Sequence, residues 1–202
     1  MKGGRLPSLM AHILNRTFKA FVILLSLLAV ALLLSGCSSE PRQRANSAME
    51  RANEEIAAHD ALYDEARAAY EEARGSSPEE GGESTAQAQS LSEARQTMQQ
   101  ARDRLQQARQ EVSGIRDLDV SAELLEYTRV LDGALEAQIR AEQHEIEFYE
   151  LAAEDPALEE NRERATGILA EAEDAYNEAE DGYERAAEIG DSNPRMAAPQ
   201  SD

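Results

Sequence analysis

Histidines, carboxylates and a single cysteine are the side chains of this sequence that could carry chemistry. The stretch His144 to Phe148, HEIEF, comes close to the zinc-binding pattern His-Glu-x-x-His, but Phe148 stands where the second histidine is needed. His59 falls on a helical seam, where we interpret it as a partly buried polar insert. The 40 acids are so frequent that their spacing singles out no catalytic pair. The sequence therefore predicts no catalytic residue, no metal site and no enzyme.

The cysteine, Cys37, stands at the end of an apolar run that follows a basic leader. Residues 1–20 contain four basic residues and no acid, and Phe21–Leu34 is an apolar run of 14 residues. Because a bilayer-spanning helix needs roughly 20 apolar residues, this order of segments indicates a secretory signal peptide. A membrane-spanning anchor with short flanks is the alternative. Both Met1 and Met10 are compatible with the start of such a signal.

The residues that end this leader, Leu34-Ser35-Gly36-Cys37, resemble the lipobox of bacterial lipoproteins. The resemblance covers residues 1–37. It implies a diacylglyceryl group on the Cys37 thiol, cleavage of the signal between Gly36 and Cys37, and acylation of the new amino group, for example with palmitate. No cofactor other than this covalent lipid is expected.

This resemblance also implies where the chain resides. Residues 1–36 would be the lipoprotein signal peptide, and residues 37–44 the lipidated N-terminus and linker. The membrane is then a partner through the lipid anchor, since two or three acyl chains suffice for stable anchoring. The protein would lie in the cell envelope, outside the cytoplasm. Ser38, where Asp would favour retention, implies by resemblance to enteric lipoproteins an outer membrane facing the periplasm, if the cell has two membranes.

The region from Cys37 onward is strongly acidic. It holds all 40 acids against 16 basic residues, every one Arg, which gives a net charge of −24. Such a surface repels phosphate backbones and anionic lipid headgroups. Nucleic acid is therefore not an expected partner, and the lipid on Cys37, not the protein surface, should hold the protein at the membrane. A surface without Lys resembles proteins of salt-loving bacteria, although a GC-rich genome that favours Arg would give the same composition.

Small and apolar residues recur four and three positions apart in two stretches that residues 75–83 separate. The first stretch comprises Ala45, Met49, Ala52, Ile56, His59, Tyr63, Ala66, Tyr70 and Ala73. The second comprises Leu91, Ala94, Met98, Ala101, Leu105, Ala108, Val112 and Ile115. The separating loop contains Pro and Gly, which cost about 3 and 1 kcal/mol within a helix. We therefore expect an antiparallel hairpin over residues 45–116, which brings Tyr70 near Leu91 and Met49 near Val112.

A second helical hairpin is expected over residues 121–190. Ser121 is a suitable N-cap for its first helix, whose apolar face comprises Leu124, Leu131, Leu135, Ile139, Ile146 and Tyr149. Asp155 and Pro156 are predicted to cap and open the last helix. The seam of that helix comprises Leu158, Ala165, Leu169, Ala172, Tyr176, Ala179, Tyr183 and Ala186.

These patterns predict an all-α fold, a coiled-coil bundle of about four long helices in antiparallel hairpins, which resembles coiled-coil helical lipoproteins. Residues 191–202 are predicted to be a disordered tail. Acids stand four residues before Arg at Glu136/Arg140 and Asp181/Arg185, which predicts ion pairs within one helix. Heptads alone also permit a long rod that dimerises through the same seam, so a homo-oligomer stays open as an alternative.

Part of the C-terminal half, residues 126–194, resembles the tetratricopeptide repeat. The segment YELAAE at Tyr149–Glu154 recurs as YERAAE at Tyr183–Glu188, 34 residues later, and Gly133 and Gly167 match in the same register. The Trp and Leu that the family carries before the Gly are missing. The resemblance implies a peptide-binding module, and tyrosines packed inside a bundle would argue against it. The side chains of the implied partner groove are Tyr149, Tyr176 and Tyr183.

The sequence thus favours a lipid-anchored, extracytoplasmic helical protein without catalytic activity. Such a protein would serve as an envelope spacer, a scaffold, or a docking surface for another envelope protein. The alternative is the tetratricopeptide-like peptide-binding module in the C-terminal half.

Overall fold

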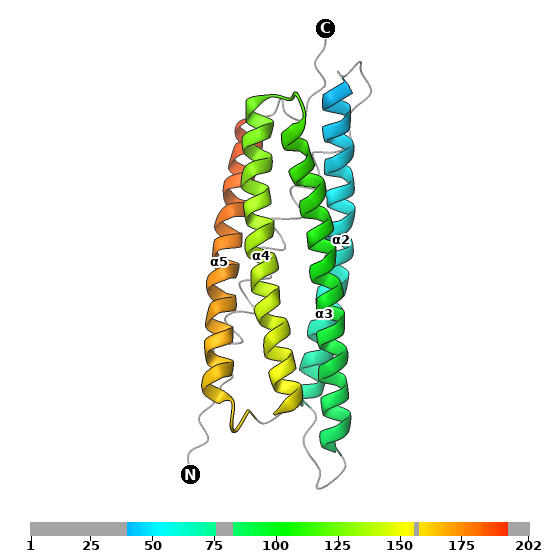
Figure 1. The fold of residues 1–202 in the computed structure, drawn as a ribbon, viewed down its shortest axis with the longest axis vertical. Coiled ribbons are helices and arrows are strands. Elements are labelled where there is room, and N and C mark those ends of the chain that lie inside the picture. The colour runs from blue at the N-terminus through cyan, green and yellow to red at the C-terminus, as the bar shows by residue number, and fades with distance from the viewer. Residues whose placement is uncertain (1–39, 76–82, 156–157, 194–202) are drawn as a thin grey trace.

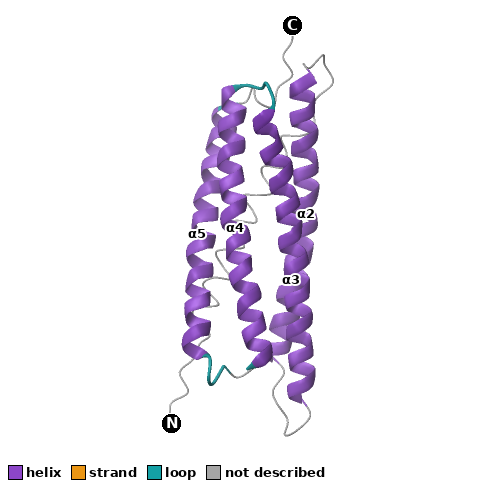
Figure 2. Cartoon of the chain, in the orientation of Figure 1, coloured by secondary structure: helices purple, strands orange, loops and turns teal. Residues whose placement is uncertain are grey.

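The computed structural model describes residues 40–75, 83–155 and 158–193. These ranges form four long helices: α2 (Glu40–Gly75), α3 (Glu83–Gly114), α4 (Ala122–Glu154) and α5 (Arg162–Ser192). A short 3-10 turn, η2 (Ile115–Asp117), follows α3. The described residues contain no strand (Figure 2), so the predicted all-α fold is confirmed. None of the helices described is both long and apolar enough to cross a membrane.

The helices lie side by side and alternate in direction, which makes an elongated bundle (Figure 1). α2 packs against α3, α3 against α4, and α4 against α5, whereas the backbones of α2 and α5 approach each other far less. At about 1.5 Å per residue, the 36 residues of α2 span roughly 54 Å. The start of α2 lies at the same end of the bundle as η2, the start of α4 and the end of α5 (Figure 1). The opposite end is called the distal end below.

The heptad positions of the first hairpin form its core. All eight seam positions predicted between Leu91 and Ile115 are buried. Tyr70 shares a cluster of buried residues with Leu91, and Met49 packs against the cluster that contains Val112. These contacts confirm the antiparallel hairpin within one chain and exclude the extended rod for α2 and α3.

The start of α2 differs from the prediction. The helix begins at Glu40, so residues 40–44 are helical and do not belong to a linker. The additional turn is stabilised by packing further along the helix, because Ala45 and Ala48 form a buried cluster with Ile115. Pro41 is compatible with this start, since the first helical turn needs no N–H donor at that position.

The connection between α4 and α5 also differs from the prediction. Asp155 ends α4, and its carboxylate accepts hydrogen bonds from the backbone N–H groups of Glu159, Glu160 and Asn161 at 3.1–3.2 Å. Although desolvation opposes the charged form, these bonds and one from the Asn161 side chain keep the pKa of Asp155 below its ordinary value. The helix that follows therefore begins at Arg162, and the prediction that Asp155 caps it was wrong.

The other predicted cap is confirmed, because the Ser121 Oγ accepts a hydrogen bond from the Leu124 N–H at 3.3 Å. The sequence also predicted ion pairs within single helices, and two of these are wrong. Arg140 pairs with Glu178 of α5, and Arg185 approaches Glu126 of α4 at 3.5 Å. Packing brings acids of the neighbouring helix within reach of these arginines, so the ion pairs join helices instead of following one helix.

Candidate functional site

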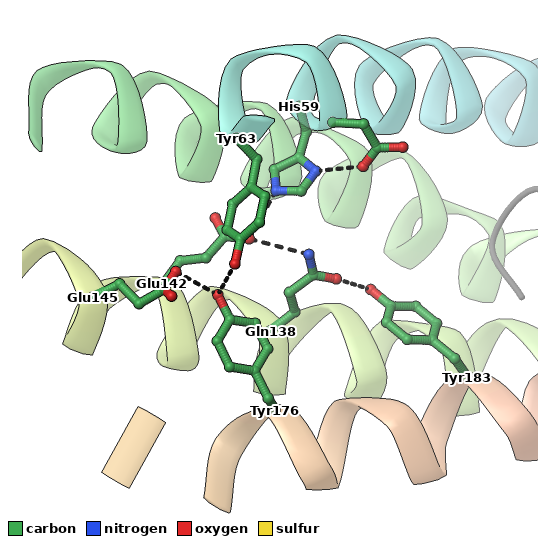
Figure 3. Close-up of polar contacts among 8 residues, drawn as sticks. His59, Tyr63, Gln138, Glu142, Glu145, Tyr176 and Tyr183 are labelled. Carbon is green, nitrogen blue, oxygen red and sulfur yellow. Dashed lines mark hydrogen bonds and ion pairs between the residues drawn. The ribbon is translucent and has the colours of Figure 1, made fainter. Parts of the chain in front are cut away.

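A group of polar side chains crosses the middle of the bundle, where the heptad pattern would otherwise place apolar residues (Figure 3). It connects three helices, α2, α4 and α5. We call it the polar layer, and its members are His59, Asp60, Tyr63, Gln138, Glu142, Glu145, Tyr176 and Tyr183.

His59 of α2 is the centre of the layer. Its ring is buried, with 2 % of the residue exposed, and each ring nitrogen meets a carboxylate. Nε2 lies 2.7 Å from Oε1 of Glu142 on α4, and Nδ1 lies 2.9 Å from Oδ1 of Asp60. A ring that donates through both nitrogens is an imidazolium. The geometry therefore holds a positive charge in the core between two negative ones.

The hydrogen bonds of Glu142 continue from α4 to α5. Gln138 Nε2 donates to the same Glu142 oxygen at 3.1 Å, and the Tyr183 hydroxyl donates to Gln138 Oε1 at 2.6 Å. Asp60, His59, Glu142, Gln138 and Tyr183 thus form one continuous chain of contacts across the bundle. The other oxygen of Glu142, Oε2, is buried and has no hydrogen-bond partner among the described residues.

A second, shorter chain of hydrogen bonds runs beside the first. The Tyr176 hydroxyl of α5 donates to Oε2 of Glu145 at 2.7 Å and lies 3.2 Å from the Tyr63 hydroxyl of α2. A hydroxyl has one hydrogen to donate, so Tyr63 donates to the Tyr176 oxygen when Tyr176 donates to Glu145. The guanidinium carbon of Arg67 lies 5.7 Å from the centre of the Tyr63 ring and supplies a second positive charge nearby.

The surroundings alter the proton affinities of both chains. Desolvation disfavours a charged imidazole, but Glu142 and Asp60 outweigh it and raise the pKa of His59 to about 10. Desolvation, with a contribution from the neighbouring Glu142 carboxylate, raises the pKa of Glu145 to about 7. Burial raises the pKa of the Tyr176 and Tyr183 hydroxyls well above their ordinary values. The layer is therefore suited to holding protons inside the bundle.

The described residues contain no group of three or more His, Cys, Asp or Glu side chains placed to hold a metal ion. His144 of the HEIEF stretch lies apart from the hydrogen bonds of the polar layer, half-buried, with Nδ1 3.4 Å from Glu171 of α5.

The interpretation of His59 as a polar insert on the seam is confirmed, and it is more deeply buried than the sequence predicted.

The three tyrosines predicted to line a partner groove lie within the bundle. Tyr149 and Tyr183 are each 3 % exposed, and the half-buried Tyr176 is directed toward Tyr63 and Glu145 (Figure 3). Tyr149 stacks on Tyr70 of α2, with ring centres 4.9 Å apart. The predicted groove is therefore wrong, because Tyr149 and Tyr183 fill the core and the Tyr176 hydroxyl is bonded to side chains of α2 and α4.

The glycines that suggested a tetratricopeptide repeat do not mediate close packing. A Cβ atom built at Gly133 or Gly167 would meet no neighbouring atom within 4 Å. The close approach of α4 and α5 occurs at Gly182, where a Cβ would lie 2.8 Å from the Cβ of Ala134. The matching positions of Gly133 and Gly167 therefore have no shared packing role.

The acids of the polar layer were not singled out from the sequence, although a signal was present. Leu135, Glu142 and Tyr149 are spaced seven apart, and so are Leu131, Gln138 and Glu145. Both sets continue the inward-facing stripe of α4, so an interrupted heptad marks Gln138, Glu142 and Glu145 as inward-facing polar residues.

The proposed lipidation and cleavage residues, Cys37 and Gly36, lie outside the described residues.

Comparisons with known proteins give no relative for this chain: no protein-family model, no curated protein and no solved structure matches it.

Proposed function

We propose that this chain is a lipid-anchored, extracytoplasmic spacer or scaffold of the cell envelope, without catalytic activity. The observation that carries the proposal is the start of α2 at Glu40, three residues after Cys37. Three residues span at most about 11 Å, so a lipid on Cys37 would hold one end of the bundle close to the membrane. The distal end would then project roughly 50 Å away from the lipid.

The charge of the chain supports an upright arrangement. With a net charge of −24 from Cys37 onward, the sides of the bundle are repelled by anionic headgroups. The lipid would insert into the bilayer and would hold only the end of the bundle that carries it. Contact of that end with the membrane is therefore favoured over contact along a side of the bundle. Surfaces at the distal end, near Gly75, Glu83 and Asp155, would be presented to an envelope partner.

Neutron reflectometry on a supported bilayer with anionic lipids tests the arrangement. The lipidated chain should give a protein layer about 50 Å thick, whereas a bundle lying on its side would give about 20–25 Å, two helix diameters. Insertion of ten Gly and Ser residues between Ser39 and Glu40 is the control, because a flexible link should let the bundle tilt and thin the layer. A thin layer for the unaltered chain would contradict the spacer.

The anchor itself is tested by Cys37→Ser. This variant should take up no labelled palmitate and should leave the membrane fraction or remain uncleaved, because the chain has no other thiol. Continued palmitate labelling together with partition into detergent would show that the lipobox assignment is wrong.

A further inference from the structure

The α2–α5 side of the bundle is the side on which the backbones approach least, yet the polar layer crosses it. There the Tyr63 hydroxyl of α2 and the Tyr176 hydroxyl of α5 are 3.2 Å apart, and Tyr176 also contacts Glu145 of α4 at 2.7 Å. This hydrogen-bonded group connects the α2–α3 hairpin to the α4–α5 hairpin, in addition to the chain of contacts from His59 to Tyr183. Its strength depends on the state of the Glu145 carboxyl.

Glu145 is half-buried and stands next to the fully buried carboxylate of Glu142. Glu142 stands three residues earlier on α4, so the two side chains lie on the same face of the helix. Glu142 is fully buried, and its Oε2 accepts no hydrogen bond from any described residue. A negative charge on Glu145 would therefore lie beside the Glu142 carboxylate, one oxygen of which already has no hydrogen-bond donor.

The charged and titratable groups that face Glu145 come from three helices: Tyr63, Arg67 and Tyr70 from α2, Glu142 and Tyr149 from α4, and Tyr176 from α5. In the described part of the chain, α3 presents no hydrogen bond or ion pair to Glu145. With Glu145 ionised, the positive charges of His59 and Arg67 oppose three carboxylates, those of Asp60, Glu142 and Glu145. With Glu145 protonated, the same groups balance.

We propose that Glu145 is a proton-operated latch: the protonated carboxyl keeps the two hairpins closed along the α2–α5 side, and loss of that proton separates Tyr63 from Tyr176. The bundle then opens about the α3–α4 contact, which ion pairs between Arg109 and both Asp132 and Glu136 hold together. Opening exposes the half-buried Glu145 fully to water, where its charge is solvated. The proton moves from the carboxyl to solvent, and no covalent bond other than O–H changes.

The sign of the pH dependence follows from the raised proton affinity. The pKa of Glu145 is about 7 in the closed bundle, above the ordinary glutamate value of 4.5. Between these values the closed form keeps a proton that an open form has released, so closure weakens as the pH rises through this window. Between pH 5.5 and 8.0 this difference should increase opening at least about tenfold.

Hydrogen–deuterium exchange of the full chain at pH 5.5 and 8.0, corrected for the intrinsic exchange rate, tests the latch. Peptides around Tyr63 and Tyr176 should lose at least about tenfold in protection at the higher pH. Peptides around Leu105 and Leu135 of α3 and α4 should change much less. Glu145→Gln, which mimics the protonated carboxyl, should keep the α2 and α5 peptides protected at both pH values.

The control variant is Glu184→Gln, which removes an exposed carboxylate from α5 and should behave as the unaltered chain does. His59 also releases its proton at alkaline pH, so the latch is measured as the part of the change that Glu145→Gln abolishes. An equal pH dependence in Glu145→Gln, or equal loss of protection in all four helices, would overturn the proposal. So would a Glu145 carboxyl that titrates near pH 4.5 in a carbon-13 NMR measurement.

Discussion

At the scale of single residues, the pair formed by His59 and Glu142 places two opposite charges in the core. Glu142 is fully buried, and its charge is neutralised by His59 of α2, which lies 83 positions earlier in the chain. Removing a buried charge pair and replacing it with apolar side chains is often neutral, whereas removing one partner leaves an uncompensated charge. We therefore expect the pair to contribute more to the specificity of the α2–α4 arrangement than to the net free energy of folding.

The buried charge pair predicts strong energetic coupling between His59 and Glu142. His59→Leu alone should lower the free energy of unfolding by about 3–5 kcal/mol, because the carboxylate of Glu142 loses its counter-charge. The double variant His59→Leu/Glu142→Leu should recover much of that loss. Urea denaturation near pH 6 of both single variants and the double variant gives the coupling energy. Additive effects would show that the two side chains do not stabilise each other.

At the scale of helices, the approach of α4 to α5 depends on one small residue. Gly182 faces Ala134, and a methyl group at 182 would lie 2.8 Å from the Ala134 Cβ and 3.2 Å from its Cα. A contact this short with a backbone atom cannot be relieved by a side-chain rotation, so one helix must move. Gly167, on the same helix, has open space around its missing Cβ.

These two positions provide a matched pair of substitutions. Gly182→Ala should destabilise the bundle by about 1–3 kcal/mol through overpacking, an effect that the better helix propensity of alanine reduces. Gly167→Ala should stabilise it by about 0.5–1 kcal/mol, since only the propensity changes. Thermal denaturation followed by circular dichroism distinguishes the two. Equal shifts of the melting temperature in the same direction would contradict the close approach at Gly182.

At the scale of the whole molecule, charge opposes the compact bundle. Ion pairs such as Arg51 with Glu111 and Arg109 with Glu136 join neighbouring helices at 2.7 and 2.8 Å. They are exposed, so each contributes at most about 1 kcal/mol, and the arginines are far fewer than the acids. Long-range repulsion among the remaining carboxylates therefore persists after folding.

Screening of this repulsion predicts stabilisation by salt. Raising NaCl from low concentration to about 1 M should raise the melting temperature of the protein from Cys37 onward, because the Debye length falls from tens of ångströms to about 3 Å. KCl should act equally at equal ionic strength, which separates screening from the binding of one particular ion. A melting temperature that stays constant or falls would contradict the balance of charges described here.

The sequence by itself determined the helices and their inward faces, because both depend on periodicity along the chain. The positions from Leu91 to Ile115 repeat with the period of a helix, so their burial followed as soon as any partner covered that face. The loop near Pro78 likewise marked the break between the first two helices. The sequence did not determine the helix ends in the same way, because Asp155 suits the N-cap of α5 and the C-cap of α4 equally well.

Only the tertiary structure decided how the polar residues meet. Glu142 and Glu145 are two of 40 acids, and although the heptad of α4 marks both as inward-facing, it does not determine which side chain of another helix each one meets. The orientation of Tyr176 was undecided in the same way, since a seam tyrosine suits a groove or a core equally. A contact such as Tyr63 with Tyr176 joins residues 113 positions apart, and it exists because packing of α3 against α4 brings α2 and α5 to face each other.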